Sequence, residues 1–154
     1  MFLSSLNITI AIDTCGYAPK ENFQRIVPYT DIFLYDFKFI DDELHNKYTG
    51  VGNKQILDNL KYLSKSGARI FLRMILLDGI NTDFSLLRSR IAWLKDNNIQ
   101  VEEINLLPYH DFGRKKYAQL DRECTQNFSV PSDETLKAIK NIFEESGYRV
   151  SIGG

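Results

Sequence analysis

Residues 32–38 read IFLYDFK, a mostly apolar run that an acid, Asp36, and a base, Lys38, interrupt near its end. We predict a strand over 32–37, and four more apolar runs predict further strands. These are residues 8–12 (ITIAI), 70–77 (IFLRMILL), 101–107 (VEEINLL) and the short run 149–152 (RVSI). The first three runs in chain order are nearly continuous in apolar residues, which is typical of parallel strands covered on both faces. A charged pair at the end of such a strand needs an explanation.

Helical periodicity lies between these runs. The predicted helices are residues 54–66, 83–97 and 133–146, with a weaker one at 21–27. Asn53 and Ser132 are expected N-caps, and Gly67 and Gly147 are expected helix stops. Strands that alternate with helices imply βαβ units with right-handed crossovers. We therefore expect an α/β fold with an open, mostly parallel sheet, in a single domain over residues 1–154.

The composition is that of a globular domain and argues against several classes of function. Of 154 residues, 44% are hydrophobic and 25% are charged, and the net charge is −1. This balance does not suggest a basic surface for nucleic acid or membrane. The opening residues lack a signal-peptide pattern, and no run approaches the ~20 apolar residues that span a bilayer, so we expect a cytoplasmic protein. Cys15 and Cys124 are too few for a disulfide framework or a metal site built from cysteine alone, and Cys15 is expected to be a small loop side chain.

Polar side chains lie at the ends of several predicted strands. In a parallel sheet the carboxyl ends of the strands share one rim, and ligands bind there. Asp36 and Lys38 project to the same side, because side chains two apart in a strand do so. The other candidates are Asp13 and Thr14 after the first strand, Arg73 inside the third, and His110 after the fourth. A cluster of mixed charge suits a zwitterionic ligand, since acids bind an ammonium group or a cation and bases bind a carboxylate.

Each candidate also has a simpler interpretation. Asp36 and Lys38 fit an exposed ion pair worth ~0–1 kcal/mol. His110 fits an ordinary loop histidine, and Asp13-Thr14 fits a turn or a cap. His45 is expected to be a solvated helix residue. The residues by themselves therefore support a ligand-binding α/β domain and nothing narrower.

Four segments, taken in order, carry a family resemblance. They are AIDTCGYAPKENF at 11–23, DIFLYDFKFIDDELHNKYTGVGNKQILDNLKYLSKSGARI at 31–70, LLPYH at 106–110 and VSIGG at 150–154. Together they resemble the glycyl-radical-enzyme activating proteins, the group of the pyruvate formate-lyase activating enzymes in the radical S-adenosylmethionine (SAM) superfamily. The resemblance implies a partial (βα)6 TIM-like barrel. It also implies reductive SAM cleavage at a 4Fe-4S cluster, giving a radical that takes hydrogen from a glycine of a partner enzyme.

The resemblance implies roles for the candidate residues. Four positions match SAM-binding residues of the family: Asp36 and Lys38 at the amino-acid end of SAM, Arg73 from the next strand, and His110 at the nucleoside side. Asp13 and Thr14 match the loop that, together with Asp36, holds a monovalent cation beside the SAM carboxylate. No catalytic residue is implied within this chain.

The chain departs from the family pattern in two important places. The cluster motif C-x3-C-x2-C, whose three thiolates leave one iron open for SAM, is absent, and so is the glycine-glycine-glutamate stretch after the second family strand. Cys15 and Cys124 do not match the positions of cluster ligands. NITIAIDT at 7–14 matches the third family strand, so we expect about the last four βα units of such a protein. Asp78 stands where the family usually has proline, which changes the expected shape of that loop.

We therefore expect the C-terminal portion of a glycyl-radical-enzyme activase, whose parent is an oxidoreductase. The complete enzyme would use SAM and a 4Fe-4S cluster and would act on a glycyl radical enzyme. The chain alone is expected to hold no bound cofactor and to be inactive, and the free edge of its first strand is expected to favour self-association. The alternative is a non-catalytic α/β binding module that retains docking of the partner. These residues do not indicate which glycyl radical enzyme is activated.

Overall fold

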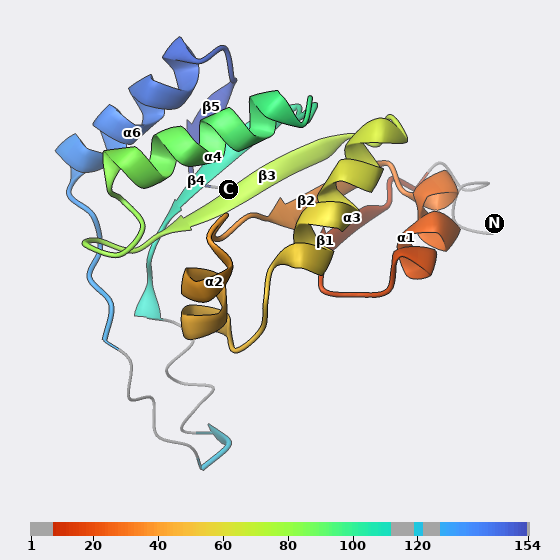
Figure 1. Cartoon of the computed structure of the whole chain (residues 1–154), viewed down its shortest axis with the longest axis horizontal. Coiled ribbons are helices and arrows are strands. Elements are labelled where there is room, and N and C mark those ends of the chain that lie inside the picture. The colour runs from red at the N-terminus through yellow and green to blue at the C-terminus, as the bar shows by residue number, and fades with distance from the viewer. Residues whose placement is uncertain (1–7, 112–118, 122–126, 154) are drawn as a thin grey trace.

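The chain folds into strands and helices that alternate around one sheet (Figure 1). The computed structural model describes residues 8–111, 119–121 and 127–153. Within these ranges the strands are β1 (Ala11–Thr14), β2 (Ile32–Asp36), β3 (Ile70–Leu76), β4 (Glu103–Pro108) and β5 (Val150–Ile152). The helices are α1 (Lys20–Ile26), the 3-10 helix η2 (Val27–Tyr29), α2 (Asp42–Thr49), α3 (Lys54–Lys65), α4 (Phe84–Asp96) and α6 (Asp133–Glu145).

The five strands form one sheet whose spatial order is the chain order, β1-β2-β3-β4-β5. Every neighbouring pair is parallel. Such stepwise addition of strands is the winding of a TIM-like barrel that has not closed. The predicted α/β fold with an open parallel sheet is confirmed, and β1 and β5 are its two edges.

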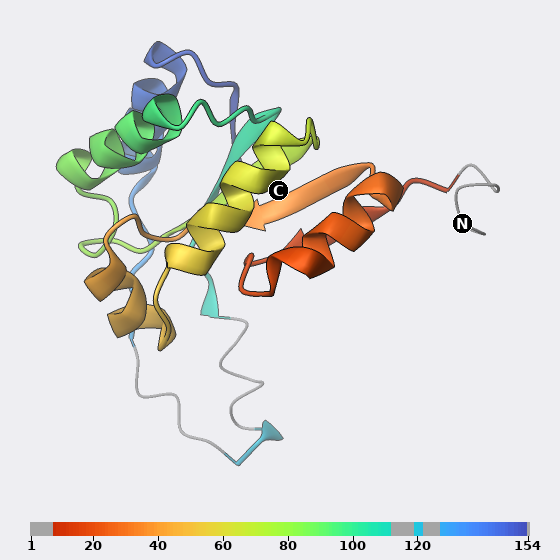
Figure 2. The same ribbon diagram turned by 45° about the vertical axis from the view of Figure 1, so that its right-hand side comes forward.

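The hydrophobic core lies on one face of the sheet. Side chains from β2 and β3 alternate between buried and partly exposed along each strand. The buried set, which includes Phe33, Tyr35, Leu72 and Met74, packs against the apolar stripes of α1, α3, α4 and α6 in one continuous cluster. Figures 1 and 2 show α3 and α4 lying across this face. The helical stripes therefore determine which side of each strand is buried.

The opposite face of the sheet is only partly covered by the described residues. Asp36 and Arg73 on this face are half-buried, and Ile75 is exposed. The expectation of strands covered on both faces is therefore wrong for this part of the chain. Helices α1, α3, α4 and α6 pack on the covered outer side, as in a barrel wall, and the candidate polar residues lie on the side that they leave open.

Two predicted features of the local structure are corrected. The first strand is β1 at Ala11–Thr14, shifted toward the carboxyl end from the predicted 8–12, because the backbone N–H of Ile10 donates to the side chain of Asp31. Asn53 does not cap α3 with its side chain. Its backbone is in the helical region, with φ −99° and ψ −7°, and its amide instead donates to the carbonyl groups of Phe39 and Ile40.

The other helix signals are confirmed. Ser132 accepts a hydrogen bond from the N–H of Thr135, so it is the N-cap of α6. Gly67 and Gly147 follow α3 and α6 with positive φ, as glycines that stop helices do. Among the described residues, no helix combines the length and the apolar character that crossing a bilayer requires.

Candidate functional site

The segment from Asp36 to Phe39 explains the charged pair in the opening stretch. It leaves β2 in extended form, so alternate side chains point to opposite sides. Phe37 and Phe39 are buried, and Phe37 packs against Trp93 of α4 at 5.7 Å between ring centroids. Asp36 and Lys38 face the open side of the sheet, where their side chains remain 20% and 30% exposed. The alternation of the extended chain thus places aromatic side chains in the core and charged side chains on the open side.

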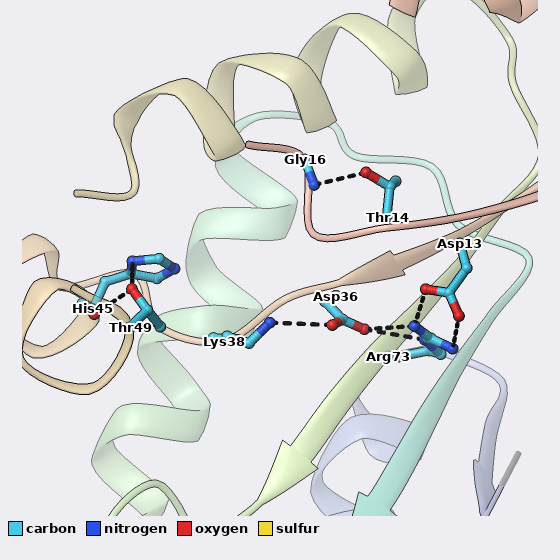
Figure 3. Close-up of polar contacts among 8 residues, drawn as sticks. All are labelled: Asp13, Thr14, Gly16, Asp36, Lys38, His45, Thr49 and Arg73. Atoms are coloured by element: carbon cyan, nitrogen blue, oxygen red, sulfur yellow. Dashed lines mark hydrogen bonds and ion pairs between the residues drawn. The ribbon is translucent and has the colours of Figure 1, made fainter. Parts of the chain in front are cut away.

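Arg73 connects the polar residues of three neighbouring strands (Figure 3). It is directly opposite Asp36 in the register of β2 and β3. Its Nε and Nη2 donate to Asp36 Oδ1 at 3.1 and 2.8 Å. Its Nη1 donates to Asp13 Oδ2 at 2.9 Å, and Nη2 donates to Asp13 Oδ1. Lys38 Nζ completes the network by donating to Asp36 Oδ2 at 3.1 Å.

The network holds two acids and two bases and is open to solvent. Burial lowers the pKa of the Arg73 guanidinium, but its bonds and charge interactions with Asp13 and Asp36 outweigh this and raise the pKa above its ordinary value. Arg73 therefore stays cationic. The side chain of Asp13 is 63% exposed, and ion pairs of this kind contribute only ~0–1 kcal/mol to stability. A ligand with charges of both signs would meet little resistance in exchanging these pairs for its own.

An apolar pocket adjoins the network at Lys38. Its volume is about 350 Å³. Most of the lining side chains are aliphatic or aromatic: Phe39, Tyr48, Ile75, Leu77, Leu107, Pro108, Tyr109 and Phe128. Polar groups enter from Lys38, Thr49, Asn81 and His110. His110 lines the same pocket as Lys38.

The loop after β1 is held by Thr14, which the sequence placed in a turn or cap, and by Asn59 and Tyr35, which sequence reasoning missed. Thr14 Oγ1 accepts a hydrogen bond from the N–H of Gly16 at 3.0 Å. The side-chain amide of Asn59, on α3, donates to the carbonyl groups of Gly16 and Ala18 at 2.9 and 2.8 Å. The ring of Tyr35 lies against Gly16 of the same loop, and its hydroxyl donates to the carbonyl of Ile56 at 2.6 Å. Nothing near Asn59 in the sequence indicates these partners, which lie 41 and 43 residues away.

The environment of His45 also differs from the one predicted from the sequence. It is 2% exposed, so the prediction of a solvated helix residue is wrong. Its Nδ1 lies 2.8 Å from the carbonyl oxygen of Val51 and 2.9 Å from Thr49 Oγ1. These contacts fold the turn after α2 back onto the helix, so polar partners four and six residues ahead satisfy the buried ring.

The remaining predicted positions are quickly placed. Cys15 is exposed in the loop after β1, and Cys124 lies outside the described residues. Asp78 donates its backbone N–H to the carbonyl of Ser129 at 3.0 Å. Within residues 8–111, 119–121 and 127–153, no group of three or more His, Cys, Asp or Glu side chains is placed to hold a metal ion.

Comparisons with known proteins identify the relatives of this chain. No protein-family model matches it. It is 44% identical over 153 residues to the trans-4-hydroxy-L-proline dehydratase activating enzyme of Clostridioides difficile, covering 97% of this chain and 50% of that protein. It is 36% identical to the choline trimethylamine-lyase activating enzyme of Oleidesulfovibrio alaskensis, with coverages of 94% and 48%. The chain thus spans about half the length of these curated relatives.

Solved structures agree with this relationship. A crystal structure of a domain of pyruvate-formate lyase-activating enzyme from Bacteroides vulgatus matches with a TM-score of 0.82 and 26% identity, over 98% of this chain and 84% of that one. A radical SAM methyltransferase from Sphaerobacter thermophilus matches with a TM-score of 0.68 at 17% identity, over 96% of this chain and 42% of that one, which shows a shared fold. The predicted resemblance is confirmed: the chain is homologous to glycyl-radical-enzyme activating enzymes and spans about half the length of the curated relatives it matches.

Proposed function

We propose that this chain supplies the SAM-binding rim of a glycyl-radical-enzyme activating enzyme. In the complete enzyme, a 4Fe-4S cluster would supply the electron that cleaves SAM and so leads to hydrogen removal from a glycine of the partner protein. The observation that carries the proposal is the junction at Lys38, where a network of mixed charge meets an apolar, aromatic pocket. SAM has the same two halves, a zwitterionic amino acid and a flat nucleoside.

The charged half of the site suits the amino-acid end of SAM. Asp36 would accept hydrogen bonds from the ammonium group, while Lys38 and Arg73 would donate to the carboxylate. Because Arg73 already bridges Asp13 and Asp36, a monovalent cation held by Asp13, Thr14 and Asp36 would share these carboxylates with the guanidinium. The acidic and basic side chains of the network therefore provide the chemical groups that both SAM and a monovalent cation need.

The pocket suits the nucleoside. Its volume of about 350 Å³ lies within the range of small-molecule sites, which are mostly apolar with a few polar groups that fix orientation. Phe39 and Tyr48 form a stacked pair at 5.4 Å and give the pocket a rigid aromatic wall. His110 lines the pocket beside Tyr109 and would orient the polar edge of the nucleoside.

The cluster itself does not fit the residues of this chain. Three thiolates are needed, and the sequence holds only two cysteines. We propose that the chain alone is inactive and that a cluster-bearing segment with the C-x3-C-x2-C motif must accompany it. Mixing or fusing the chain with the cluster-bearing half of a relative should restore formation of 5′-deoxyadenosine from SAM under reducing conditions. No product from either half alone is expected.

Titration of the chain with SAM tests the rim directly. We expect binding in the millimolar range, on the order of −4 kcal/mol, because the cluster that would chelate the amino acid is missing. Backbone amide chemical shifts should move around Lys38 and around the pocket. Asp36→Asn should weaken SAM binding about tenfold, since it removes the charged partner of the ammonium group. Adenosine, which lacks that group, should bind Asp36→Asn and wild type alike.

Asp58→Asn is the matched control, because Asp58 is an exposed acid on α3 with a side chain that is 59% exposed. It should change neither titration. Equal SAM affinity of Asp36→Asn and Asp58→Asn would refute the assignment of the amino-acid end. Shift changes that avoid the pocket would refute the assignment of the nucleoside end.

A further inference from the structure

Arg90 on α4 has an unusual environment. It is only 2% exposed, and its Nη2 is buried without a hydrogen-bond partner among the described residues. Burial lowers the pKa of this guanidinium to about 10, so it still carries its charge at neutral pH. A buried charge without a full set of partners costs several kcal/mol. Such a residue is expected to have a function that outweighs this cost.

The contacts of Arg90 lead to the pocket. Its guanidinium carbon lies 5.7 Å from the ring centroid of Phe39, which is within the range of a cation–π contact. Its Nη1 donates to the carbonyl oxygen of Asn81 at 3.5 Å. Phe39 comes from the loop after β2 and Asn81 from the loop after β3, and both line the pocket beside Lys38. One side chain therefore contacts two walls of the pocket from behind.

Phe39 and Asn81, the two wall residues that Arg90 contacts, are themselves bonded or packed to other residues of the pocket. The Phe39 ring stacks on Tyr48 with an angle of 13° between the planes. The Asn81 side chain accepts from the N–H of Leu77 and donates to the carbonyl of Ile75, both at 2.7 Å. Leu77 and Ile75 line the same pocket. A shift of Arg90 would thus move an aromatic wall and the end of β3 together.

Two side chains of helix α4 contact the segment from Asp36 to Phe39. Arg90 and Trp93 are three residues apart, on one face of the helix. They contact Phe39 and Phe37, which are two apart on one side of the extended segment. Lys38 lies between these two phenylalanines and points the other way, where it meets Asp36. By contacting the residues before and after Lys38, α4 therefore sets the position of the Lys38 backbone.

We infer that Arg90 is a positioning residue for the nucleoside pocket, acting through Phe39 and Asn81 and not by contact with the ligand. The inference rests on the proposed function, because it assigns Arg90 to the shape of the same pocket. It predicts a separation of effects that a purely structural residue would not give. Removing the guanidinium should loosen the pocket and weaken nucleoside binding without lowering the stability of the fold.

Three variants of the full chain test this inference. Arg90→Met keeps the length and the apolar contacts but removes the charge, and Arg90→Lys keeps a cation near Phe39 but loses the planar fork. Arg88→Met is the control, because Arg88 is exposed on the same helix. Urea unfolding, SAM and adenosine titrations, and the ring signal of Phe39 in ¹³C-phenylalanine-labelled protein are measured for each variant. The Phe39 signal is assigned from the spectrum of Phe39→Leu.

We expect Arg90→Met to be at least as stable as wild type, since it removes an incompletely paired buried charge. Its affinity for SAM and adenosine should fall about threefold to tenfold, because binding would then have to order the Phe39 ring that Arg90 no longer holds in place. Its Phe39 signal should shift and broaden. Arg90→Lys should bind with an intermediate affinity, and Arg88→Met should match wild type in all measurements.

Affinity within twofold of wild type together with an unchanged Phe39 signal in Arg90→Met would overturn the inference. Should Arg90→Met not fold, Arg90→Lys decides, because wild-type affinity and an unchanged Phe39 signal there would overturn the inference equally. Failure of the wild-type chain to bind either ligand would refute the proposed function instead. The Phe39 signal would still decide whether Arg90 positions this wall.

Discussion

Gly16 in the loop after β1 gives the sharpest test of how the site loop is held. Its φ is +77°, in the left-handed region that residues with a side chain rarely adopt. A Cβ placed on it would lie less than 3.0 Å from Oη and Cζ of Tyr35. Tyr35 is fully buried, and its hydroxyl is bonded to the carbonyl of Ile56. The ring cannot retreat without breaking that bond, so Gly16→Ala should be strongly destabilising.

The size of the effect follows from two costs. The left-handed backbone costs an alanine roughly 1–2 kcal/mol, and overpacking against a fixed ring costs roughly 1–3 kcal/mol more. Gly16→Ala should therefore lower the free energy of unfolding by roughly 2–5 kcal/mol, a large part of the stability of a domain of this size. Gly67→Ala is the matched control. Its φ is +73°, but apart from its chain neighbours no heavy atom of the protein lies within 4 Å of the added Cβ, so only the first cost applies.

Urea unfolding of the two variants measures the difference between them, which is the steric cost alone. Tyr35→Phe provides a second check, because it removes the nearest atom of the ring. On its own it should destabilise by about 1–3 kcal/mol, since the carbonyl of Ile56 loses its donor. In the Gly16→Ala background it should cost clearly less. Equal stability of Gly16→Ala and Gly67→Ala, or strict additivity with Tyr35→Phe, would refute the reasoning.

Three further predictions follow from the structure. Asn59→Leu should lower the free energy of unfolding by about 1–3 kcal/mol, because two carbonyl groups of the Gly16 loop lose their donor; urea unfolding measures this, and an unchanged midpoint contradicts it. Hydrogen bonds from Ser85 lower the pKa of the Asp83 carboxyl. The stabilisation by Asp83 should therefore be fully present above the ordinary pKa of about 3.9 and be lost as pH falls through the lower folded value. In this pH range the free energy of unfolding of Asp83→Ala should depend less on pH than that of wild type, and an equal dependence contradicts this. The outer edge of β1 is unpaired within the described sheet, so sedimentation at rising concentration should show self-association, whereas a monomer throughout opposes it.

The elements of this fold could be predicted because each depends on local pattern. The apolar runs and helical stripes predicted the five strands and four of the helices, since burial on one face leaves a period in the sequence. The start of β1 was misplaced because Ile8 and Ile10 are apolar, yet Ile8 remains 47% exposed beside an uncovered edge. The second covered face was wrongly expected because Leu34, Phe71 and Ile75 are apolar although only partly covered.

The contacts that hold the site could not be predicted from local pattern. Asn59 binds backbone 41 and 43 residues away, and nothing near it in the sequence indicates that partner. His45 looked solvated because its neighbours are charged, although its own side chain turns inward to Val51. The ion pair considered for Asp36 and Lys38 does exist, but its side chains are only 20% and 30% exposed. It is one edge of a wider network whose centre, Arg73, lies inside a strand.

The charged network and the core depend on each other, although they lie on opposite faces of the sheet. The network contributes little to stability because its ion pairs are partly exposed, so its geometry must come from elsewhere. That geometry comes from the covered face, where α4 holds Phe37 and Phe39 while Asp36 and Lys38 project to the open side. Register then places Arg73 opposite Asp36. The polar side chains are thus oriented before any ligand arrives, and this preorganisation is what binding sites of high specificity require.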